Sequence, residues 1–182
     1  GTLQIDGSAW ARSQVELTGG TLTVMGELAA LGRLQQSGGT LKGTRLVTIH
    51  GQFTWTGGTQ SESGETVANG GIDFSGSTHY LNTRTLTLNA ASTHSGGLLR
   101  LQNGATIDIN SPFSILTDDD IYHYTGASIP TINNNSTITK SAGSGSAKLQ
   151  GQFYNSGTVT VSSGELWVGH SNGTGTSTGA FE

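Results

Sequence analysis

Three consecutive carboxylates, Asp118, Asp119 and Asp120, form the densest group of reactive side chains in the sequence. Carboxylate oxygens are preferred ligands of Ca²⁺, and two carboxylates across a sugar can supply the acid and base of glycoside hydrolysis. The next acidic residue is Glu165, so no calcium-loop spacing follows the run. The aspartates are therefore candidate Ca²⁺ ligands, but we expect an acidic turn in solvent, with no catalytic residue and no cofactor.

Five histidines are the next candidates for chemistry, and they stand at positions 50, 79, 94, 123 and 170. No two of them are closer than 15 residues, whereas zinc sites built on one element favour close pairs. The spacing predicts isolated histidines at the surface or at corners, although adjacent repeats could bring His79 and His94 together. Because the sequence has no cysteine, it excludes disulfide bonds, thiolate metal sites and cysteine nucleophiles.

Four aromatic residues, Tyr122, Tyr124, Trp167 and Trp10, could stack on sugar rings. Exposed aromatic side chains are favoured at contact sites. Trp167 lies between two aliphatic residues that should face inward, so alternation along a strand places its indole outside. We predict that these four residues contact carbohydrate, with simple covering of the domain surface as the alternative.

Polar repeats in the sequence have simpler explanations than dedicated sites. Asn-x-Ser/Thr occurs at Asn134, Asn135 and Asn172, where turn chemistry is expected rather than glycosylation. Threonine pairs such as Thr21 and Thr23 resemble those of ice-binding surfaces, but Lys42 interrupts the array one repeat later. Threonine is also a good former of solvent-facing strands, which is the interpretation we prefer.

The elements that must position these residues are short strands at a fixed period. The tripeptide Gly-Gly-Thr occurs at 19–21, 38–40 and 57–59, so both steps are 19 residues. Apolar-x-apolar units recur throughout, which gives each minimal strand one buried and one polar face. No segment has sustained helical spacing, and we interpret Leu28-Ala29-Ala30-Leu31 as no more than a turn.

Strands this short need stacked neighbours, because two or three residues cannot form a stable sandwich alone. The period therefore predicts an all-β fold, a single-stranded parallel β-helix of about 19 residues per coil. At about 4.8 Å per coil, roughly nine coils make a rod on the order of 45 Å long. A β-sandwich is the alternative fold, but it gives no reason for the repeated step. We expect Phe53 and Trp55, on one strand face, to be core residues.

The composition excludes several classes of function. Lys and Arg total only 8 without a basic run, so no nucleic-acid partner is expected. No apolar run approaches the 18 or more residues of a membrane span, so no membrane insertion is expected either. The chain begins and stops within the pattern, and we interpret residues 1–182 as one β-helix domain of a longer repeat protein.

Two segments carry a resemblance to a known group of proteins. They are 64–81, GETVANGGIDFSGSTHYL, and 151–166, GQFYNSGTVTVSSGEL. These segments resemble the repeat regions of filamentous-haemagglutinin-type and autotransporter-passenger adhesins of bacteria, and the likeness covers most of the chain. The resemblance implies a right-handed helix, export, and a role in reach, adhesion or matrix. It brings no catalytic residues with it.

The stretch 111–131 departs from the repeat, since it holds both prolines and lacks Gly-Gly. We predict an irregular coil or a protruding loop there, the kind of position where function tends to lie on a rigid scaffold.

Together these features predict a structural or adhesive stalk, secreted or at the cell surface, and not an enzyme. Its expected partners are flanking coils of the same polypeptide and a polysaccharide or host-cell surface. The alternative is a polysaccharide lyase or hydrolase on the same scaffold. Arg84 and Arg100 could lie on adjoining coils in such an enzyme, but no acidic cluster obviously joins them.

Overall fold

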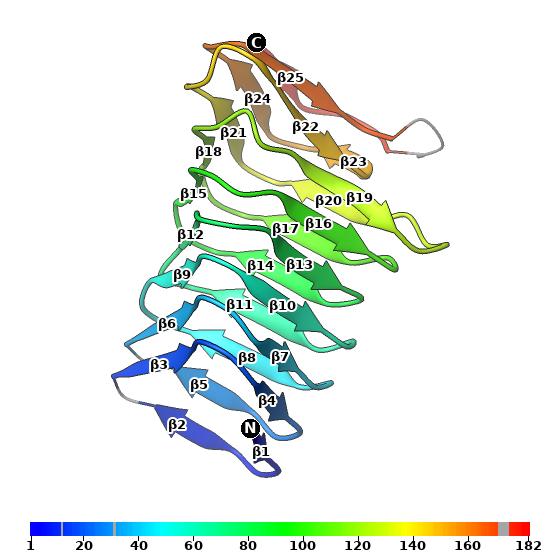
Figure 1. The fold of residues 1–182 in the computed structure, drawn as a ribbon. Helices are drawn as coiled ribbons and strands as arrows, with labels where there is room; N and C mark the ends of the chain where they lie inside the picture. Colours follow the sequence, from blue (N-terminus) through cyan, green and yellow to red (C-terminus); the bar gives the residue numbers. More distant parts are fainter. Residues whose placement is uncertain (12, 31, 171–174) are drawn as a thin grey trace.

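Three parallel β-sheets wrap around one elongated core in a computed structural model of the chain (Figure 1). The structure describes residues 1–11, 13–30, 32–170 and 175–182, and only the backbone of residues 11, 29 and 30. Each turn of the chain adds one strand to each sheet, so the fold is a β-solenoid of about nine turns. None of the described residues forms a helix that could span a membrane.

The strands of each sheet stack in chain order along the axis. Sheet A contains β1 (Thr2–Ile5), β4 (Thr21–Val24), β7 (Thr40–Lys42), β10 (Gly58–Ser61), β13 (His79–Asn82), β16 (Leu99–Gln102), β19 (Ile121–Thr125), β22 (Ser146–Gln150) and β25 (Glu165–Val168). Sheet B contains β2 (Ala9–Ala11), β5 (Leu28–Ala30), β8 (Leu46–Ile49), β11 (Glu65–Ala68), β14 (Thr85–Leu88), β17 (Thr106–Ile109), β20 (Thr131–Asn134) and β23 (Gln152–Asn155). Sheet C contains β3 (Gln14–Leu17), β6 (Arg33–Gln36), β9 (Phe53–Trp55), β12 (Ile72–Phe74), β15 (Ser92–His94), β18 (Phe113–Ile115), β21 (Thr137–Lys140), β24 (Thr158–Val161) and β26 (Ala180–Phe181).

The register confirms the 19-residue step for the first coils. Thr21 pairs with Thr40, and Thr40 pairs with Thr59, so the threonine of each Gly-Gly-Thr stacks on the next. Farther along sheet A the steps lengthen to 21, 20, 22 and 28 residues, through the row Thr59, Tyr80, Arg100, Tyr122 and Gln150. In sheet A the coil length is therefore 19 residues up to Thr59 and variable from there on.

The glycines of Gly-Gly-Thr are required by the corner before sheet A. Gly20 and Gly39 have φ angles of 68° and 64°, in the left-handed region that disfavours other residues. A Cβ atom on Gly39 would also lie 2.7 Å from the carbonyl oxygen of Gly20 in the coil below. Backbone conformation and the close stacking of coils together explain why this position repeats as glycine.

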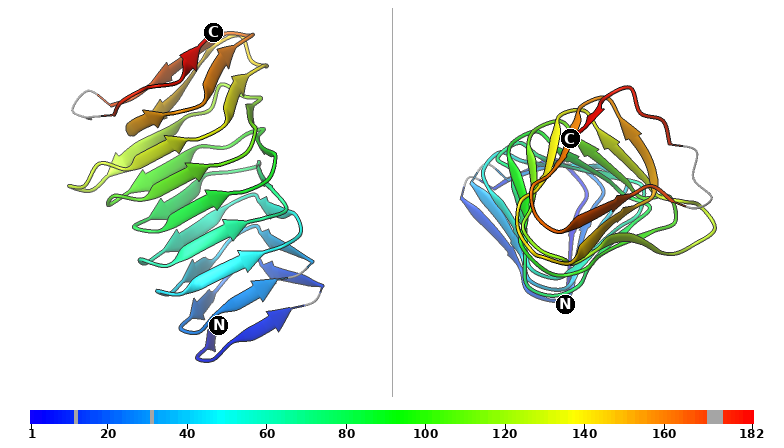
Figure 2. Two further views of the ribbon diagram at one scale, coloured as in Figure 1. Left: turned by 180° about the vertical axis from the view of Figure 1, so that it is seen from behind. Right: turned by 90° about the horizontal axis from the view of Figure 1, so that it is seen from above.

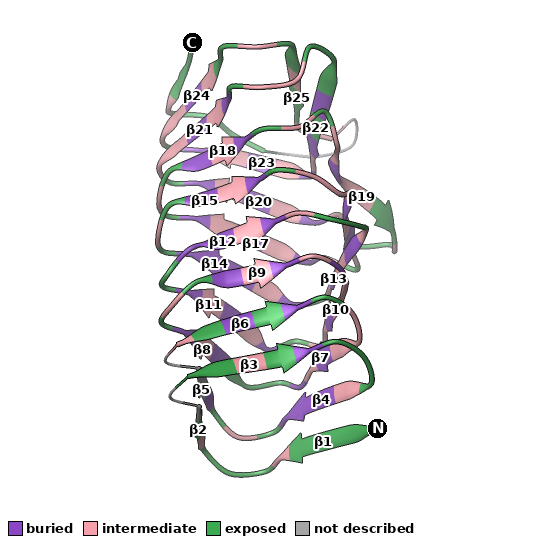
Figure 3. Cartoon of the chain, turned by 60° about the vertical axis from the view of Figure 1, so that its left-hand side comes forward, coloured by how far each residue is buried: buried purple, intermediate pink, exposed green. Residues whose placement is uncertain are grey.

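Side chains alternate between a buried interior and an exposed outer wall, as Figure 3 shows by colour. Phe53 and Trp55 are both 0% exposed, which confirms them as core residues. The expected turn at Leu28-Ala29-Ala30-Leu31 is wrong for its first three residues, because Leu28–Ala30 forms strand β5 and pairs in parallel with β8. Adjacent coils supply the hydrogen bonds that so short a strand lacks alone.

The stretch 111–131 holds two strands that belong to the solenoid. β18 pairs in parallel with β15 and aligns Phe113 with Ser92, whereas β19 pairs with β16 through a register shift between Leu101 and Gln102. The corner that follows, residues 126–130, extends sideways beyond the corners beneath it (Figure 2). The irregularity of this stretch is thus concentrated at the end of β19 and in the corner after it.

The corner between sheets B and C is the most uniform. From β8 to β24 it always has two or three residues, whereas the corner between sheets A and B varies from one residue to five over the same coils. The uniform corner carries an asparagine ladder, in which Asn89 Nδ2 donates to Asn69 Oδ1 at 3.0 Å, as do Asn110 to Asn89 at 3.0 Å and Asn135 to Asn110 at 2.9 Å. Asn135 thus has the expected turn role, whereas Asn172 is outside the described residues.

Two of the histidines are core residues, which corrects the expectation of surface or corner positions. His79 and His94 are both fully buried, and both rings pack edge-on against Phe74. Their Nε2 atoms lie 2.7 Å from the carbonyl oxygens of Trp55 and Gly97, respectively. Each imidazole is accommodated in the aromatic interior because a backbone carbonyl accepts its one N–H. The Nδ1 atom of each ring has no hydrogen-bond partner.

The buried histidines predict acid destabilisation of the fold. Burial lowers the pKa of both His79 and His94 below the ordinary value of 6.5. The unfolded chain then binds more protons, so the free energy of unfolding should fall as pH drops below about 6.5 toward the folded-state values. Each unit of pKa difference costs about 1.4 kcal/mol.

Urea unfolding at pH 7.5 and pH 5 measures this loss. His94→Met should reduce the loss between the two pH values, whereas substitution of the exposed His50 by alanine should leave it unchanged. Equal losses in the parent chain and in His94→Met would contradict the assignment of acid sensitivity to this buried ring.

Candidate functional site

Four side chains on the outer wall of sheet A form a group that we call the Tyr–Arg cluster: Tyr80, Arg100, Tyr122 and Tyr124. They come from β13, β16 and β19, three successive strands. Tyr80 pairs with Arg100 and Arg100 pairs with Tyr122, so these three residues occupy one row along the axis. The residues that flank Tyr80 and Arg100 in their strands are buried, because successive residues of a strand face opposite sides.

The Arg100 guanidinium lies at the centre of the cluster. Its Nε donates to the Tyr122 hydroxyl at 2.9 Å, and its Nη1 donates to the Tyr80 hydroxyl at 2.8 Å. Its Cζ also lies 4.3 Å from the centre of the Tyr124 ring, a cation–π distance. Tyr124 meets both other tyrosines edge-on, with ring centres 6.3 Å and 6.2 Å apart. Three aromatic rings therefore hold one cation in a fixed position.

The charge of Arg100 has no carboxylate partner among the residues that the structure describes. The ion pairs there join Lys42 with Glu62, Lys140 with Asp118, and Lys148 with Asp120. The hydrogen bond with the Tyr122 hydroxyl is the largest influence on Arg100, and it raises the pKa of this group. The cluster thus presents a positive charge that the protein itself does not neutralise.

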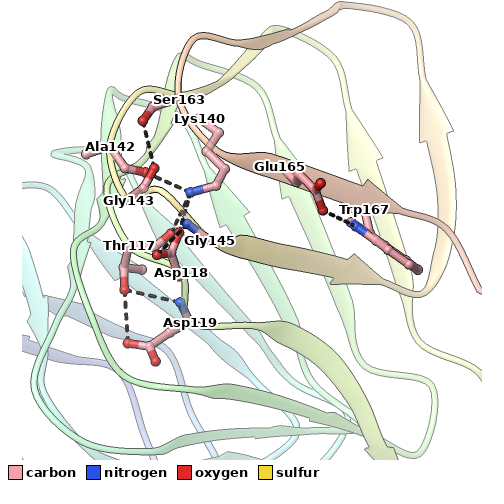
Figure 4. A network of polar contacts seen from close by, with 10 residues as sticks. All are labelled: Thr117, Asp118, Asp119, Lys140, Ala142, Gly143, Gly145, Ser163, Glu165 and Trp167. Atoms are coloured by element: carbon pink, nitrogen blue, oxygen red, sulfur yellow. Dashed lines mark hydrogen bonds and ion pairs between the residues drawn. The ribbon is translucent and has the colours of Figure 1, made fainter.

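The same face continues to Trp167, whose indole is 63% exposed and donates to Glu165 at 3.2 Å (Figure 4). Between the Tyr–Arg cluster and Trp167 lies β22, which places Lys148 beside Trp167 and Gln150 beside Tyr122. Lys148, Gln150 and Trp167 line an open hollow of about 510 Å³. Sheet A therefore brings together three of the four aromatic residues predicted to contact sugars.

Trp10 is not part of this face. It lies on β2 of sheet B in the first coil, and it is 65% exposed. Sequence reasoning grouped it with the tyrosines by residue type, but sheet B and sheet A form different walls of the solenoid.

The three aspartates each contact a different part of the structure, and Figure 4 shows two of them, Asp118 and Asp119. Asp118 accepts from the buried Lys140 Nζ at 2.8 Å, Asp119 accepts from the Gly97 backbone N–H at 2.8 Å, and Asp120 pairs with Lys148 at 3.3 Å. The Lys140 ammonium lowers the pKa of Asp118. Among the described residues, no group of three or more histidines or carboxylates could hold a metal ion. These contacts join neighbouring coils through the acidic turn.

Arginines 84 and 100 were considered together because of their spacing, but they have different environments. Arg84 is fully buried, whereas Arg100 is part of the outer wall. An open hollow of about 680 Å³ elsewhere gathers Asp6, Glu27, Arg45 and Glu65 along the corner between sheets A and B. Carboxylates from three coils therefore line one hollow, at a corner that sequence reasoning did not single out.

His123 and His170 approach each other next to the Tyr–Arg cluster. The Nδ1 atom of His123 lies 3.3 Å from the Nε2 atom of His170, and the other nitrogen of His123 is 3.1 Å from the Gly126 carbonyl oxygen. The two histidines are 47 residues apart in the sequence, so their spacing did not predict that they form a pair.

Comparison with known proteins adds no relative. No protein-family model, no curated protein and no solved structure matches the chain. The resemblance to adhesin repeats therefore stays a prediction, and the site itself must indicate the function.

Sequence reasoning missed Tyr80 and considered Arg100 only beside Arg84, not as a member of this cluster. A signal for them was available, because each is the outward residue of a unit with two buried neighbours. Aligning those units with 121–125 would have placed both residues in one row with Tyr122. The varying coil length after Thr59 concealed that alignment.

Proposed function

We propose that this chain is a rigid spacer of an extracellular bacterial surface protein, and that sheet A contacts carbohydrate through its aromatic residues. The spacer role follows from the mechanics of stacked coils. From β1 to β24 successive coils are hydrogen-bonded in three sheets, and the interior is mostly stacked apolar side chains, with a few buried polar ones such as Arg84 and His79. Each coil contacts only the coils beside it, but it does so around its perimeter. Bending the solenoid would open these contacts on one side, so the stacked coils resist it.

The observation that carries the carbohydrate role is the alignment of aromatic side chains on one wall. The Tyr–Arg cluster and Trp167 extend over the five strands from β13 to β25, which is about 19 Å at 4.8 Å per step. Tyrosine and tryptophan offer large apolar faces with a polar group at one end, and they are enriched where proteins bind partners. An extended glycan along the axis would contact them in succession.

Retention on insoluble polysaccharides, followed by a glycan array, tests the proposal. We expect Tyr124→Ala and Trp167→Ala each to weaken binding about fivefold to tenfold, since a hot-spot truncation costs more than 1 kcal/mol. Trp10→Ala is the matched control, because Trp10 is equally exposed but lies on sheet B, and it should leave binding unchanged.

Release of reducing or unsaturated ends should be measured on the same polysaccharides. Turnover would replace the spacer proposal with the enzyme alternative. Retention that is equal in the parent chain, Tyr124→Ala and Trp167→Ala would remove sheet A as the contact face.

A further inference from the structure

Arg100 is held in place before any ligand arrives. Two tyrosine hydroxyls fix its Nε and Nη1 atoms, and its Cζ atom lies over the Tyr124 ring. An exposed arginine ordinarily has considerable rotamer freedom, which it loses on binding. Here the cluster has already removed much of that freedom, so a ligand would meet a preorganised cation.

The donors of Arg100 are only partly used. A guanidinium has five N–H groups. The two bonds to tyrosine hydroxyls leave three without an acceptor among the described residues, including both on Nη2. Arg84 in the same chain is the opposite case, because its Nε, Nη1 and Nη2 make five hydrogen bonds within the core. The protein therefore satisfies one arginine completely and leaves the other open on its surface.

From this geometry we infer that Arg100 binds the carboxylate or sulfate oxygens of an acidic glycan. The inference rests on the proposed function and names its ligand class. Guanidinium groups bind planar oxyanions through paired, charge-assisted hydrogen bonds, which are stronger than neutral ones. Trp167 lies three strands farther along sheet A, about 14 Å away, so one extended chain can place a sugar there while its anionic group contacts Arg100.

Titration with three soluble polymers tests this inference: polygalacturonate as the carboxylate, dextran sulfate as the sulfate ester, and dextran as the neutral reference. We expect the 182-residue chain to bind at least one acidic polymer about tenfold more tightly than dextran, with an affinity that decreases as salt increases. The acidic polymer that binds more tightly identifies the source of the anion.

Variants then assign the effect to the guanidinium. Arg100→Gln should lower affinity for the acidic polymer about tenfold and affinity for dextran by much less, and Arg100→Lys should recover only part of the loss because a lysine lacks the fork. Tyr80→Phe keeps the charge but removes one hydroxyl that fixes it, so a loss of about twofold to fivefold is expected. Arg33→Gln, on the exposed surface of β6 in sheet C, is the control and should bind as the parent does.

The outcomes separate the two proposals. Equal binding of acidic and neutral polymers, with no change in Arg100→Gln, would overturn the inference and leave the carbohydrate contact standing. Loss of acidic-polymer binding in Arg33→Gln equal to that in Arg100→Gln would overturn it as well, since general charge would then suffice. Absence of binding to polysaccharides of every kind, on the array and in titration, would overturn the carbohydrate proposal and the inference with it.

Discussion

Arg84→Met is expected to lower the free energy of unfolding by about 3–5 kcal/mol, because several buried acceptors lose their donor at about 1–3 kcal/mol each. The five hydrogen bonds of Arg84 reach the Thr66 hydroxyl and the carbonyl oxygens of Gly43, Arg45, Ser61 and Glu65. A methionine of similar length would remove all five donors. The Gly43 carbonyl keeps its bond from the Gly64 N–H, but the other acceptors lose their Arg84 partner, and each group left unsatisfied costs about 1–3 kcal/mol.

Arg84 also ends a buried polar chain. Gln36, Gln60 and Thr66 link to it by successive hydrogen bonds of 3.2, 2.7 and 2.8 Å. Burial lowers the pKa of Arg84 to about 10, because desolvation outweighs the attraction of the nearby carboxylates Glu62 and Glu65. The guanidinium therefore stays charged at neutral pH, and its acceptors are what make that charge tolerable in the core.

Urea unfolding measures the effect, with Arg33→Met as the matched control. Arg33 has an exposed side chain, so its replacement should change stability by less than about 0.5 kcal/mol. Arg84→Lys should fall between the two, since lysine has three donors instead of five. Equal midpoints for Arg84→Met and Arg33→Met would show that the buried hydrogen bonds contribute nothing net.

Trp55→Ala is the second large effect, and we expect it to cost about 3–5 kcal/mol. The Trp55 ring is fully buried and contacts Phe53, Phe74 and His79, with ring centres 5.2 to 5.8 Å apart. Its Nε1 also donates to the Gly57 carbonyl at 3.0 Å. Truncation leaves a large cavity between coils, together with one unpaired acceptor.

The damage from Trp55→Ala should be local, since a solenoid is stabilised coil by coil. Amide hydrogen exchange is the decisive measurement. Protection should fall in β6, β9 and β12, the strand that carries Trp55 and its two neighbours, while β20, β21 and β23 keep theirs. Trp10→Ala, at an exposed tryptophan, should change neither region. A uniform loss of protection along the chain would instead mean that the solenoid unfolds as one unit.

The repeat was predictable because its signal is local. Gly-Gly-Thr marks a corner whose backbone needs glycine, and the threonine that follows starts a strand in register with the next coil. Alternation likewise predicted that Phe53 and Trp55 are buried and that Trp167 is exposed. These features depend on a few adjacent residues, so a single sequence contains them.

The polar interior was not predictable in the same way. Arg84 and His79 are in the core because acceptors from other coils satisfy them, and those acceptors lie as far as 41 residues away for Arg84 and 24 for His79. The alternation of apolar and polar residues along a strand does not predict that a charged or polar side chain is buried. Residue type alone favours a surface position for such a side chain. The same limitation affected the candidate site. Arg100 lies beside Tyr80 and Tyr122 in the structure, but predicting this requires the lengths of the intervening coils.

The unequal corners of the solenoid have a consequence for protein engineering. The corner with the asparagine ladder has nearly constant length, whereas residues 126–130 form a five-residue corner on the opposite side of sheet B, with Ala127 exposed. Loop closure costs only about 0.6 kcal/mol for each doubling of loop length. A foreign peptide grafted at Ala127 would therefore be displayed to the side of the molecule, close to the end of β19, without altering the strand pairing above or below it.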